Sequence, residues 1–308
     1  MQISIVIPTY NRYSVLIRTL KALHDPLLQT SLYEVIVVDD GSTDATPTMI
    51  PDLASSLPYK LLYLRQANRG PAAARNRGVA AASGDLILFI GDDIIPQPGF
   101  IAAHVRAHQA HPQQQIAVLG YTPWHPDVSQ TPLAQWWEDN RFRYRALLEG
   151  KIPDFSFFYT SNISVKRVFL LEGGLFDENF IYAAYEDTDL AYRLAQLGLK
   201  IIFEPAALAY HYHETDLRAI CRQMELTGRA YDYFVDKTGQ LGLSQVWTLL
   251  GTGFWMQPMF IDPLWRLADY LQTRKIIAPL FILVLMYFFQ VGRGKRPPLN
   301  LLVQKDSR

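Results

Sequence analysis

The sequence predicts an α/β domain followed by a separate helical module. Short β-branched runs alternate with longer helical patterns through the first half of the chain, which is typical of a parallel sheet. The chain has 308 residues, of which 49% are hydrophobic and 19% charged, and this composition is rich enough to bury a core. Near residue 240 the composition becomes rich in aromatic and basic residues, which indicates the start of a separate module.

Apolar runs predict four strands in the first half, at 3–7, 34–39, 60–64 and 85–90. Apolar residues at helical spacing predict a helix at 12–23, and a second helix is expected from the DDGSTD motif to about residue 53. A third helix begins at Pro71, because proline is tolerated in a first turn, and continues through the Ala-rich run PAAARNRGVAAA.

The second half is less regular. It predicts strands at 116–120, 156–165, 201–203 and 207–210, and helices within 180–200 and at 215–236. Acidic residues in YEDTDLAYRLAQLG suit the start of the first of these helices, and Gly198 suits its end. A long stretch with Trp124, Trp136 and Trp137 joins the first two strands, and a connection of that length is functional or mobile.

We expect the α/β domain to cover residues 1–214 and the helical module 215–308, with a possible membrane-interface segment at 246–292. From residue 240 onward the chain has eight basic and three acidic residues, and 276–289 carries no charge. As a helix, 276–289 would be about 21 Å long, short of a hydrocarbon core of about 30 Å. Positive charge at both ends favours a helix in an anionic interface. The alternative is a helical subdomain packed on the α/β domain or at a dimer interface.

The overall composition excludes several classes. Basic and acidic residues both number 29, which argues against a general nucleic-acid-binding protein. The single cysteine, Cys221, excludes an intramolecular disulfide framework and an all-cysteine zinc site. The start MQISIVIPTY enters a strand directly, without the pattern of a secretory signal. We therefore expect the α/β domain to be in the cytoplasm, either free or at the cytoplasmic face of a membrane.

The polar loops PTYN, DDGSTD and GDD follow predicted strands at the edge where open α/β sheets bind ligands. In GDD, Asp92 and Asp93 are adjacent carboxylates, which repel each other unless a cation or donor lies near them. Their oxygens suit Mg²⁺ or Mn²⁺, with water and phosphate oxygens as further ligands. The alternative is a solvated acidic turn.

Two further segments suit a nucleotide. After the second strand, Asp40 can accept hydrogen bonds from a base or ribose, although an ordinary Asp-Gly turn is the alternative. Residues 68–77 form a basic, glycine-containing entry into a helix that suits a diphosphate, whereas Arg69 and Arg77 are alternatively surface arginines. The sequence has no Walker loop and no GxGxxG motif, which disfavours P-loop phosphoryl transfer and Rossmann-type hydride transfer.

Acidic residues and histidines in the second half of the chain are further candidates for catalytic or metal-binding side chains. Glu186 and Asp187 open a helix after the aromatic stretch FIYAAY, where one can act as a general base; stabilisation of the helix dipole is the alternative, above all for Asp189. His211 and His213 alternate on a strand, so we expect them to point to opposite faces.

Seven segments, in order along the chain, together resemble the inverting family 2 glycosyltransferases, which are nucleotide-sugar enzymes with a GT-A fold. They run from Ile3 to about His213, about two thirds of the chain: SIVIPTYNR, VIVVDDGSTD, NRGPAAARNRG, GDD, GGLFDENF, YEDTDLAYRL and AYHYH. The resemblance implies a Rossmann-like mixed sheet flanked by helices, a nucleotide-sugar donor, most commonly a UDP-sugar, and Mg²⁺ or Mn²⁺ as the cofactor.

The resemblance also implies residue roles. Contacts with the donor nucleotide fall to Pro8, Thr9, Tyr10, Asp40, Gly70, Arg75 and Asp92. Asp93 would coordinate the metal and His211 would complete its shell, while Gly91 stands where the family often has an acid. Asp187 matches the catalytic base, with Glu186 as the alternative. Trp136 and Trp137 would line the acceptor side, since flat aromatic rings suit sugar faces, or else they are core residues.

We therefore expect a metal-dependent inverting glycosyltransferase with a cell-envelope, polysaccharide or lipid-linked acceptor, a membrane surface as partner and no nucleic-acid partner. One alternative is a catalytically silent sugar-nucleotide-binding or scaffold protein. The other is a sugar nucleotidyltransferase, which releases pyrophosphate and usually carries a glycine- and arginine-rich loop after the first strand, where this chain has PTYNR.

Overall fold

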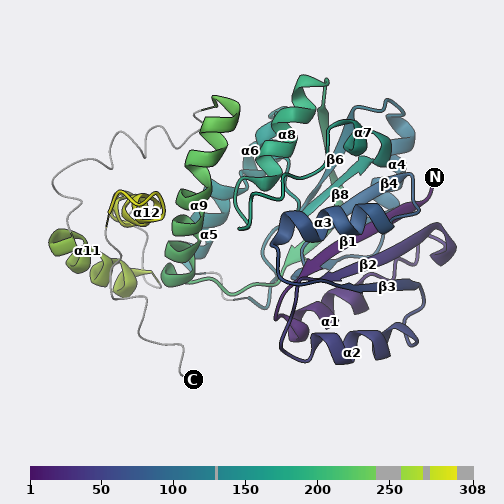
Figure 1. The fold of residues 1–308 in the computed structure, drawn as a ribbon, viewed down its shortest axis with the longest axis horizontal. Coiled ribbons are helices and arrows are strands. Elements are labelled where there is room, and N and C mark those ends of the chain that lie inside the picture. The colour runs from purple at the N-terminus through teal and green to yellow at the C-terminus, as the bar shows by residue number, and fades with distance from the viewer. Residues whose placement is uncertain (129–130, 241–257, 273–277, 297–308) are drawn as a thin grey trace. The chain divides into compact units, whose positions relative to one another are not determined.

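Eight strands in the described part of the chain form one sheet (Figure 1). The computed structural model describes residues 1–128, 131–240, 258–272 and 278–296, without the side chains of 258–260. The strands are β1 (Ile3–Thr9), β2 (Tyr33–Asp39), β3 (Lys60–Arg65), β4 (Leu86–Ile90), β5 (Ile94–Pro96), β6 (Ile116–Tyr121), β7 (Asn162–Lys166) and β8 (Lys200–His211). Their order across the sheet is β3-β2-β1-β4-β7-β6-β8-β5.

The sheet is mixed. β3, β2, β1 and β4 pair in parallel. β7 runs antiparallel to both β4 and β6, β6 and β8 are parallel, and β5 is antiparallel to β8. The alternation of strands and helices predicted for the first half is confirmed, and the antiparallel β7 agrees with the mixed sheet that the family resemblance implied.

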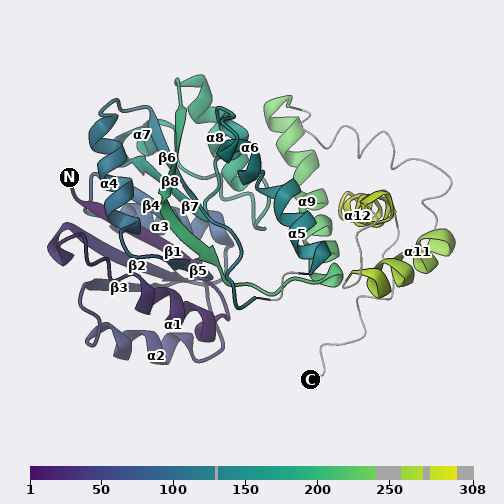
Figure 2. The same cartoon turned by 180° about the vertical axis from the view of Figure 1, so that it is seen from behind.

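Helices cover both faces of the sheet, which Figures 1 and 2 view from opposite sides. The helices of the described part of the chain are α1 (Tyr13–Ala22), α2 (Thr46–Ala54), α3 (Pro71–Ala81), α4 (Phe100–Ala110), α5 (Pro132–Arg141), α6 (Tyr144–Leu148), α7 (Arg167–Glu172), α8 (Glu186–Gln196), α9 (Leu217–Thr238), α11 (Pro258–Leu271) and α12 (Ala278–Gly292), with short 3-10 helices at Thr30–Leu32 and Phe155–Phe157. Successive strand side chains point to opposite faces. Val6 therefore joins α3, α7 and α8 in one core cluster, whereas Ile5 and Ile7 join α1, α2 and α4 in the other.

Some predicted elements of the second half differ from the structure. The strand predicted at 156–165 begins only at Asn162, because Phe155–Phe157 form a 3-10 helix in which Asp154 accepts a hydrogen bond from the Ser156 N–H. The two strands predicted at 201–203 and 207–210 are one strand, β8, whose register with β6 shifts between Gly120 and Tyr121. The sequence pattern did not indicate α4, because this helix is buried on most sides and has no clear amphipathic pattern.

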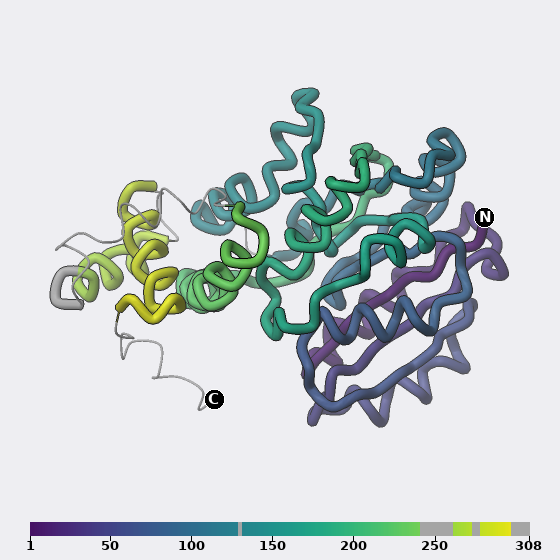
Figure 3. The backbone as a smooth tube through the Cα atoms, turned by 45° about the horizontal axis from the view of Figure 1, so that its top comes forward, coloured from purple at the N-terminus to yellow at the C-terminus, as the bar shows by residue number. Residues whose placement is uncertain are grey.

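The chain divides into two compact units. Unit 1 comprises 1–128, 141–181 and 186–213, and unit 2 comprises 129–140, 182–185 and 214–308. The backbone trace in Figure 3 shows the first half of unit 1, coloured purple to blue, as alternating strand and helix segments. The domain boundary expected after residue 214 stays a prediction.

The core of unit 2 forms around α12, whose side chains from Val284 to Gln290 are buried. α9 and α12 approach closely at two glycines: a Cβ at Gly228 would lie 2.0 Å from the Phe289 carbonyl oxygen, and one at Gly292 would lie 1.9 Å from that of Glu225. Within the expected interface segment, 246–257 and 273–277 lie outside the described residues. No helix among the described residues has both the length and the apolar character that crossing a membrane requires.

Candidate functional site

The parallel strands of unit 1 end together at one edge of the sheet. Thr9, the last residue of β1, pairs with Asp39 of β2, which in turn pairs with Arg65 of β3. β4 ends at Ile90, just before the GDD motif. The loops predicted to converge therefore do follow neighbouring strands at the ligand-binding edge of an open α/β sheet.

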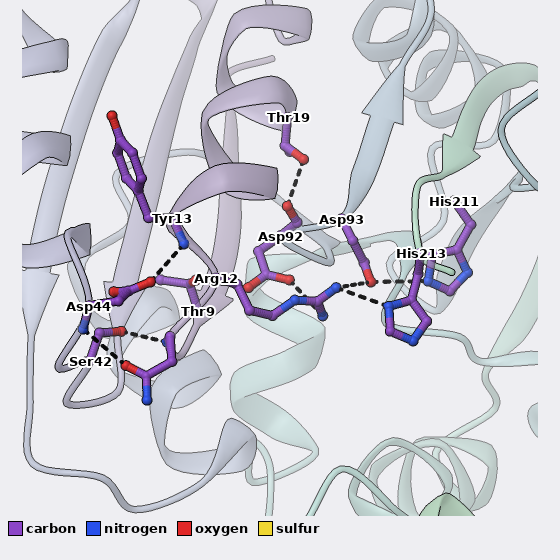
Figure 4. A network of polar contacts seen from close by, with 11 residues as sticks. Thr9, Arg12, Tyr13, Thr19, Ser42, Asp44, Asp92, Asp93, His211 and His213 are labelled. Atoms are coloured by element: carbon purple, nitrogen blue, oxygen red, sulfur yellow. Dashed lines mark hydrogen bonds and ion pairs between the residues drawn. The ribbon is translucent and has the colours of Figure 1, made fainter. Parts of the chain in front are cut away.

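A buried pair of carboxylates lies at this edge, shown in Figure 4. Thr9 Oγ1 donates a hydrogen bond of 2.8 Å to Asp92 Oδ2, and the Thr19 hydroxyl donates one of 2.7 Å to the Asp92 carbonyl. The guanidinium of Arg12 lies 3.2 Å from Asp92 Oδ1 and 2.8 Å from Asp93 Oδ2. Asp92 and Asp93 are thus held in place and share one positive partner.

The two carboxyls differ in their electrostatics. Burial raises the pKa of Asp92 to about 7, against the opposing charge of Arg12. Burial also acts to raise the pKa of Asp93, but the charge and hydrogen bond of His211 and the charge of Arg12 outweigh it and leave that pKa below its usual value. Asp93 is consequently the carboxyl that stays ionised and suits a cation.

Both histidines belong to this cluster, so the expectation that they point to opposite faces is wrong. His211 Nε2 lies 3.2 Å from Asp93 Oδ2, and His213 Nδ1 lies 3.3 Å from the Arg12 guanidinium. Their rings stack with centroids 6.1 Å apart. The alternation rule fails because β8 ends at His211, and His213 lies beyond the strand. The ring of Trp124 stacks on the ring of His211, with centroids 4.9 Å apart and an interplanar angle of 19°.

The geometry of Asp93 and His211 is compatible with a divalent cation. Two adjacent ligands at about 2.1 Å from an ion are about 3 Å apart, close to the separation of Asp93 Oδ2 and His211 Nε2. Within the described residues, no group of three or more His, Cys, Asp or Glu side chains forms a metal site. Two protein ligands fit an ion whose remaining ligands are water and phosphate oxygens.

A second acidic pair opens α8. The Arg75 guanidinium lies 2.8 Å from Glu186 Oε1, and both side chains are buried. Burial and the charge of Asp187 raise the pKa of Glu186 to about 7 despite Arg75. Asp187 is only partly buried, accepts a 2.8 Å hydrogen bond from the Thr188 N–H, and has a pKa raised by burial against the charges of Arg75 and Arg141. Arg75 thus supports Glu186, and its contact with a nucleotide stays a prediction.

Asp40 organises the loop after β3. Its Oδ1 accepts hydrogen bonds of 2.9 Å from the Gln66 amide and from the Arg69 N–H, and its Oδ2 accepts one of 2.8 Å from the Gly70 N–H. At Gly70 the φ angle is +88°, and a Cβ would lie 2.5 Å from the Ile181 carbonyl, so a larger residue does not fit. An open pocket of about 460 Å³ adjoins this loop, lined by Gly41, Arg65, Gln66, Ala67 and Asn68.

The remaining predicted residues are divided between the units. Pro8 is half-buried in β1, and Tyr10 is exposed just after it. Trp136 and Trp137 pack against the hydrophobic core of unit 2, as their alternative predicted; contact with an acceptor stays a prediction. Arg12 and Trp124 also belong to the candidate site, although neither was predicted from the sequence. For Arg12 a signal was available, since a basic residue directly after a polar strand-end loop can neutralise acids at the same edge.

Comparisons with known proteins place these features in context. The family model described as glycosyl transferase family 2 matches residues 4–164. Validoxylamine A glucosyltransferase of Streptomyces hygroscopicus subsp. jinggangensis is 31% identical over 225 residues, which is 64% of this chain and 52% of that protein. Chondroitin synthase of Escherichia coli is 27% identical over 242 residues, 68% of this chain and 34% of its own length. The chain thus spans about half or less of the length of these curated relatives.

Two solved structures share the fold. The mannosyltransferase PcManGT of Pyrobaculum calidifontis, in complex with GDP-Man and Mn²⁺, has a TM-score of 0.63 and 16% identity and covers 95% of this chain and 86% of its own. S. aureus TarS 1–349, in complex with UDP, has a TM-score of 0.56 and 17% identity and covers 95% of this chain and 88% of its own.

Proposed function

This chain belongs to glycosyl transferase family 2, and we propose that it is an inverting enzyme that moves a sugar from a nucleoside-diphosphate donor to an acceptor hydroxyl. The observation that carries this proposal is the cluster at the carboxyl edge of the sheet, where Asp92, Asp93 and His211 meet beside the ends of β1 and β4. A divalent cation beside a diphosphate is commonly held by one or two carboxylates, whereas a structural turn does not require burial of two carboxylates.

On the donor side, the base would lie near the loop that Asp40 holds, in the pocket lined by Gly41 and residues 65–68. Pro8, Thr9 and Tyr10 at the end of β1 would border the nucleotide. UDP is the donor nucleotide that we propose first, because TarS was solved with UDP and with UDP-GlcNAc; PcManGT, solved with GDP-Man, makes GDP the next to test.

Asp93 and His211 would hold Mg²⁺ or Mn²⁺, which when bound supplies positive charge to offset the charge of the departing nucleoside diphosphate. The protein's own contribution is to orient these ligands. Thr9 fixes Asp92, and the stacked Trp124 fixes the plane of the His211 ring. Both contacts keep the donor site in one arrangement before the donor binds.

For the acceptor, we propose Asp187 as the general base. Its carboxylate would accept the proton of the acceptor hydroxyl while that oxygen forms a bond to the anomeric carbon and the bond to the diphosphate breaks, which inverts the configuration. Burial raises the pKa of Asp187, which makes it a stronger base than an aspartate in water. Glu186 is the weaker candidate, because its Oε1 is engaged by Arg75 and its Oε2 is buried.

The acceptor and the location are separate parts of the proposal. We propose a cell-envelope, polysaccharide or lipid-linked glycan and attachment to the cytoplasmic face of a membrane. The apolar side chains of α12 are buried in the core of unit 2. Within the described residues, membrane contact is therefore supported by the exposed side chains of Leu267 and Tyr270 on α11. Sedimentation of the full chain with anionic and with neutral vesicles tests the membrane attachment. If the same amount of protein stays in the supernatant with vesicles of either kind as without vesicles, the proposed attachment is contradicted.

The activity is tested by incubating the purified chain and Mn²⁺ with UDP- and GDP-sugars and measuring the released nucleotide product. We expect a nucleoside diphosphate, and we expect Asp187→Asn to slow its release by about 100-fold or more while nucleotide binding persists. Glu186→Gln is the matched comparison and should slow release less. Release of pyrophosphate from a sugar phosphate and nucleoside triphosphate would identify a nucleotidyltransferase, and nucleotide binding without any turnover would identify a silent binding protein.

A further inference from the structure

Arg12 covers the carboxylate pair from the solvent side. Its side chain is 35% exposed, whereas those of Asp92 and Asp93 are 7% and 10% exposed. The guanidinium reaches both carboxylates at once, as Figure 4 shows. Of these three side chains, a ligand arriving from solvent therefore meets the guanidinium first.

The backbone that carries Arg12 is anchored, so that its guanidinium can move alone. The preceding Asn11 has a φ of +53°, and its side-chain oxygen accepts hydrogen bonds from the backbone N–H groups of Thr43 and Asp44 at 2.7 and 3.3 Å. The Asn11 N–H donates to the Ser42 hydroxyl at 2.9 Å. The arginine side chain itself is long and has several rotatable bonds, so it can change position without moving this loop.

Arg12 and a divalent cation would compete for the same oxygen. Asp93 Oδ2 is the atom that contacts the Arg12 guanidinium at 2.8 Å and also lies 3.2 Å from His211 Nε2. A cation held by Asp93 and His211 would stand beside the positive guanidinium, and like charges at such a separation repel strongly in a partly buried site. A guanidinium can instead bind phosphate oxygens with two hydrogen bonds, so a diphosphate provides it with another partner.

We propose that Arg12 is the resident counter-ion of the Asp92–Asp93 pair, and that it leaves the pair for the diphosphate when a divalent cation and a nucleoside diphosphate bind together. This inference rests on the proposed function, because it needs the cation and the donor at this site. Its consequence is ordered binding: the cation alone is opposed by Arg12, and the cation with a diphosphate is not.

The test is calorimetry on the full chain with two titrations, Mn²⁺ without nucleotide and UDP at saturating Mn²⁺. Arg12→Gln removes the charge but keeps a polar side chain, and Arg12→Lys keeps the charge. The matched control is Arg18→Gln, on helix α1, which begins directly after Arg12; the Arg18 guanidinium stacks over Tyr212 at 4.8 Å. We expect Arg12→Gln to bind Mn²⁺ alone about tenfold more tightly than the wild type and UDP about tenfold more weakly, with Arg12→Lys between them and Arg18→Gln unchanged.

Opposite signs in the two titrations are the decisive result, because a misfolded variant would lose both affinities. If Arg12→Gln binds Mn²⁺ alone no more tightly than the wild type, the counter-ion role is overturned, even if UDP affinity falls. If UDP, GDP and CDP all fail to promote Mn²⁺ binding in the wild type and in Arg18→Gln, the metal-dependent function itself fails and this inference fails with it. Weaker UDP binding in Arg18→Gln as well would also overturn the specific role of Arg12.

Discussion

The buried carboxyl of Glu186 makes the stability of the protein depend on pH. Its pKa is raised from 4.5 to about 7, first by burial and then by the charge of Asp187. A carboxyl whose pKa is higher in the folded than in the unfolded state favours the folded state while it is protonated, and this contribution is lost as the pH rises from about 4.5 to about 7. At 1.36 kcal/mol for each pKa unit, the loss is about 3 kcal/mol.

The perturbation that removes this titration is Glu186→Gln, which cannot ionise. We expect the decrease in the free energy of unfolding between pH 5 and pH 8 to be smaller in this variant than in the wild type by up to about 2.5 kcal/mol, because part of the loss occurs below pH 5. The side chain introduced by Glu186→Gln cannot form the ion pair with Arg75, but a cost of this change that does not depend on pH lowers the free energy of unfolding equally at every pH and leaves the pH-dependent difference unaltered. The rise in the pKa of Asp92 to about 7 contributes a similar trend to both proteins and cancels in the difference.

Urea unfolding at pH 5, 6, 7 and 8, followed by circular dichroism and extrapolated linearly to water, measures these free energies. Glu178→Gln is the matched control, since Glu178 also pairs with an arginine, Arg69, at 2.7 Å but on the surface. Its pH profile should run parallel to that of the wild type. Parallel profiles for the wild type and Glu186→Gln would refute the argument that burial governs this carboxyl.

Three further predictions concern packing and the donor site. Gly228→Ala should destabilise unit 2 by about 1–3 kcal/mol, because its Cβ would lie 2.0 Å from the Phe289 carbonyl; thermal unfolding measures this, and an unchanged melting temperature would contradict it. Trp124→Leu should weaken Mn²⁺ binding in the presence of UDP by about tenfold, because His211 loses the ring that orients it, whereas Trp124→Phe should retain most of the affinity; calorimetry distinguishes them, and equal losses would argue against stacking. Asp40→Asn replaces one acceptor oxygen of the 66–70 loop by a donor and should reduce UDP affinity by about tenfold in the same assay, and full affinity would show that this loop does not border the base.

Local patterns predicted much of the site because each was contained in a short stretch of sequence. The apolar run of β4 followed by Asp92 and Asp93 identifies a strand and the acids at its end, and the parallel order of β1, β2 and β4 brings their loops together. Glu186 and Asp187 at the start of α8 were identified in the same way. These inferences need only the periods of strands and helices and the rule that ligands bind at the carboxyl ends of parallel strands.

Partners far apart in the sequence could not be predicted in this way. The fold buries Arg75 against Glu186, 111 residues away, a partner that the sequence did not indicate; the expected contact of Arg75 with a nucleotide stays a prediction. His213 was expected to point away from His211, yet the end of β8 turns it into the same cluster.

The sequence by itself therefore determined the class of fold, the edge that carries the site and the chemical character of its acids, because these follow from local periodicity and residue type. The tertiary structure decided which side chains face each other: Arg12 and the Asp92–Asp93 pair, Arg75 and Glu186, and the stacked rings of Trp124 and His211. The physical reason is that burial and Coulomb interactions depend on distances in space, which the spacing of residues along the chain does not specify.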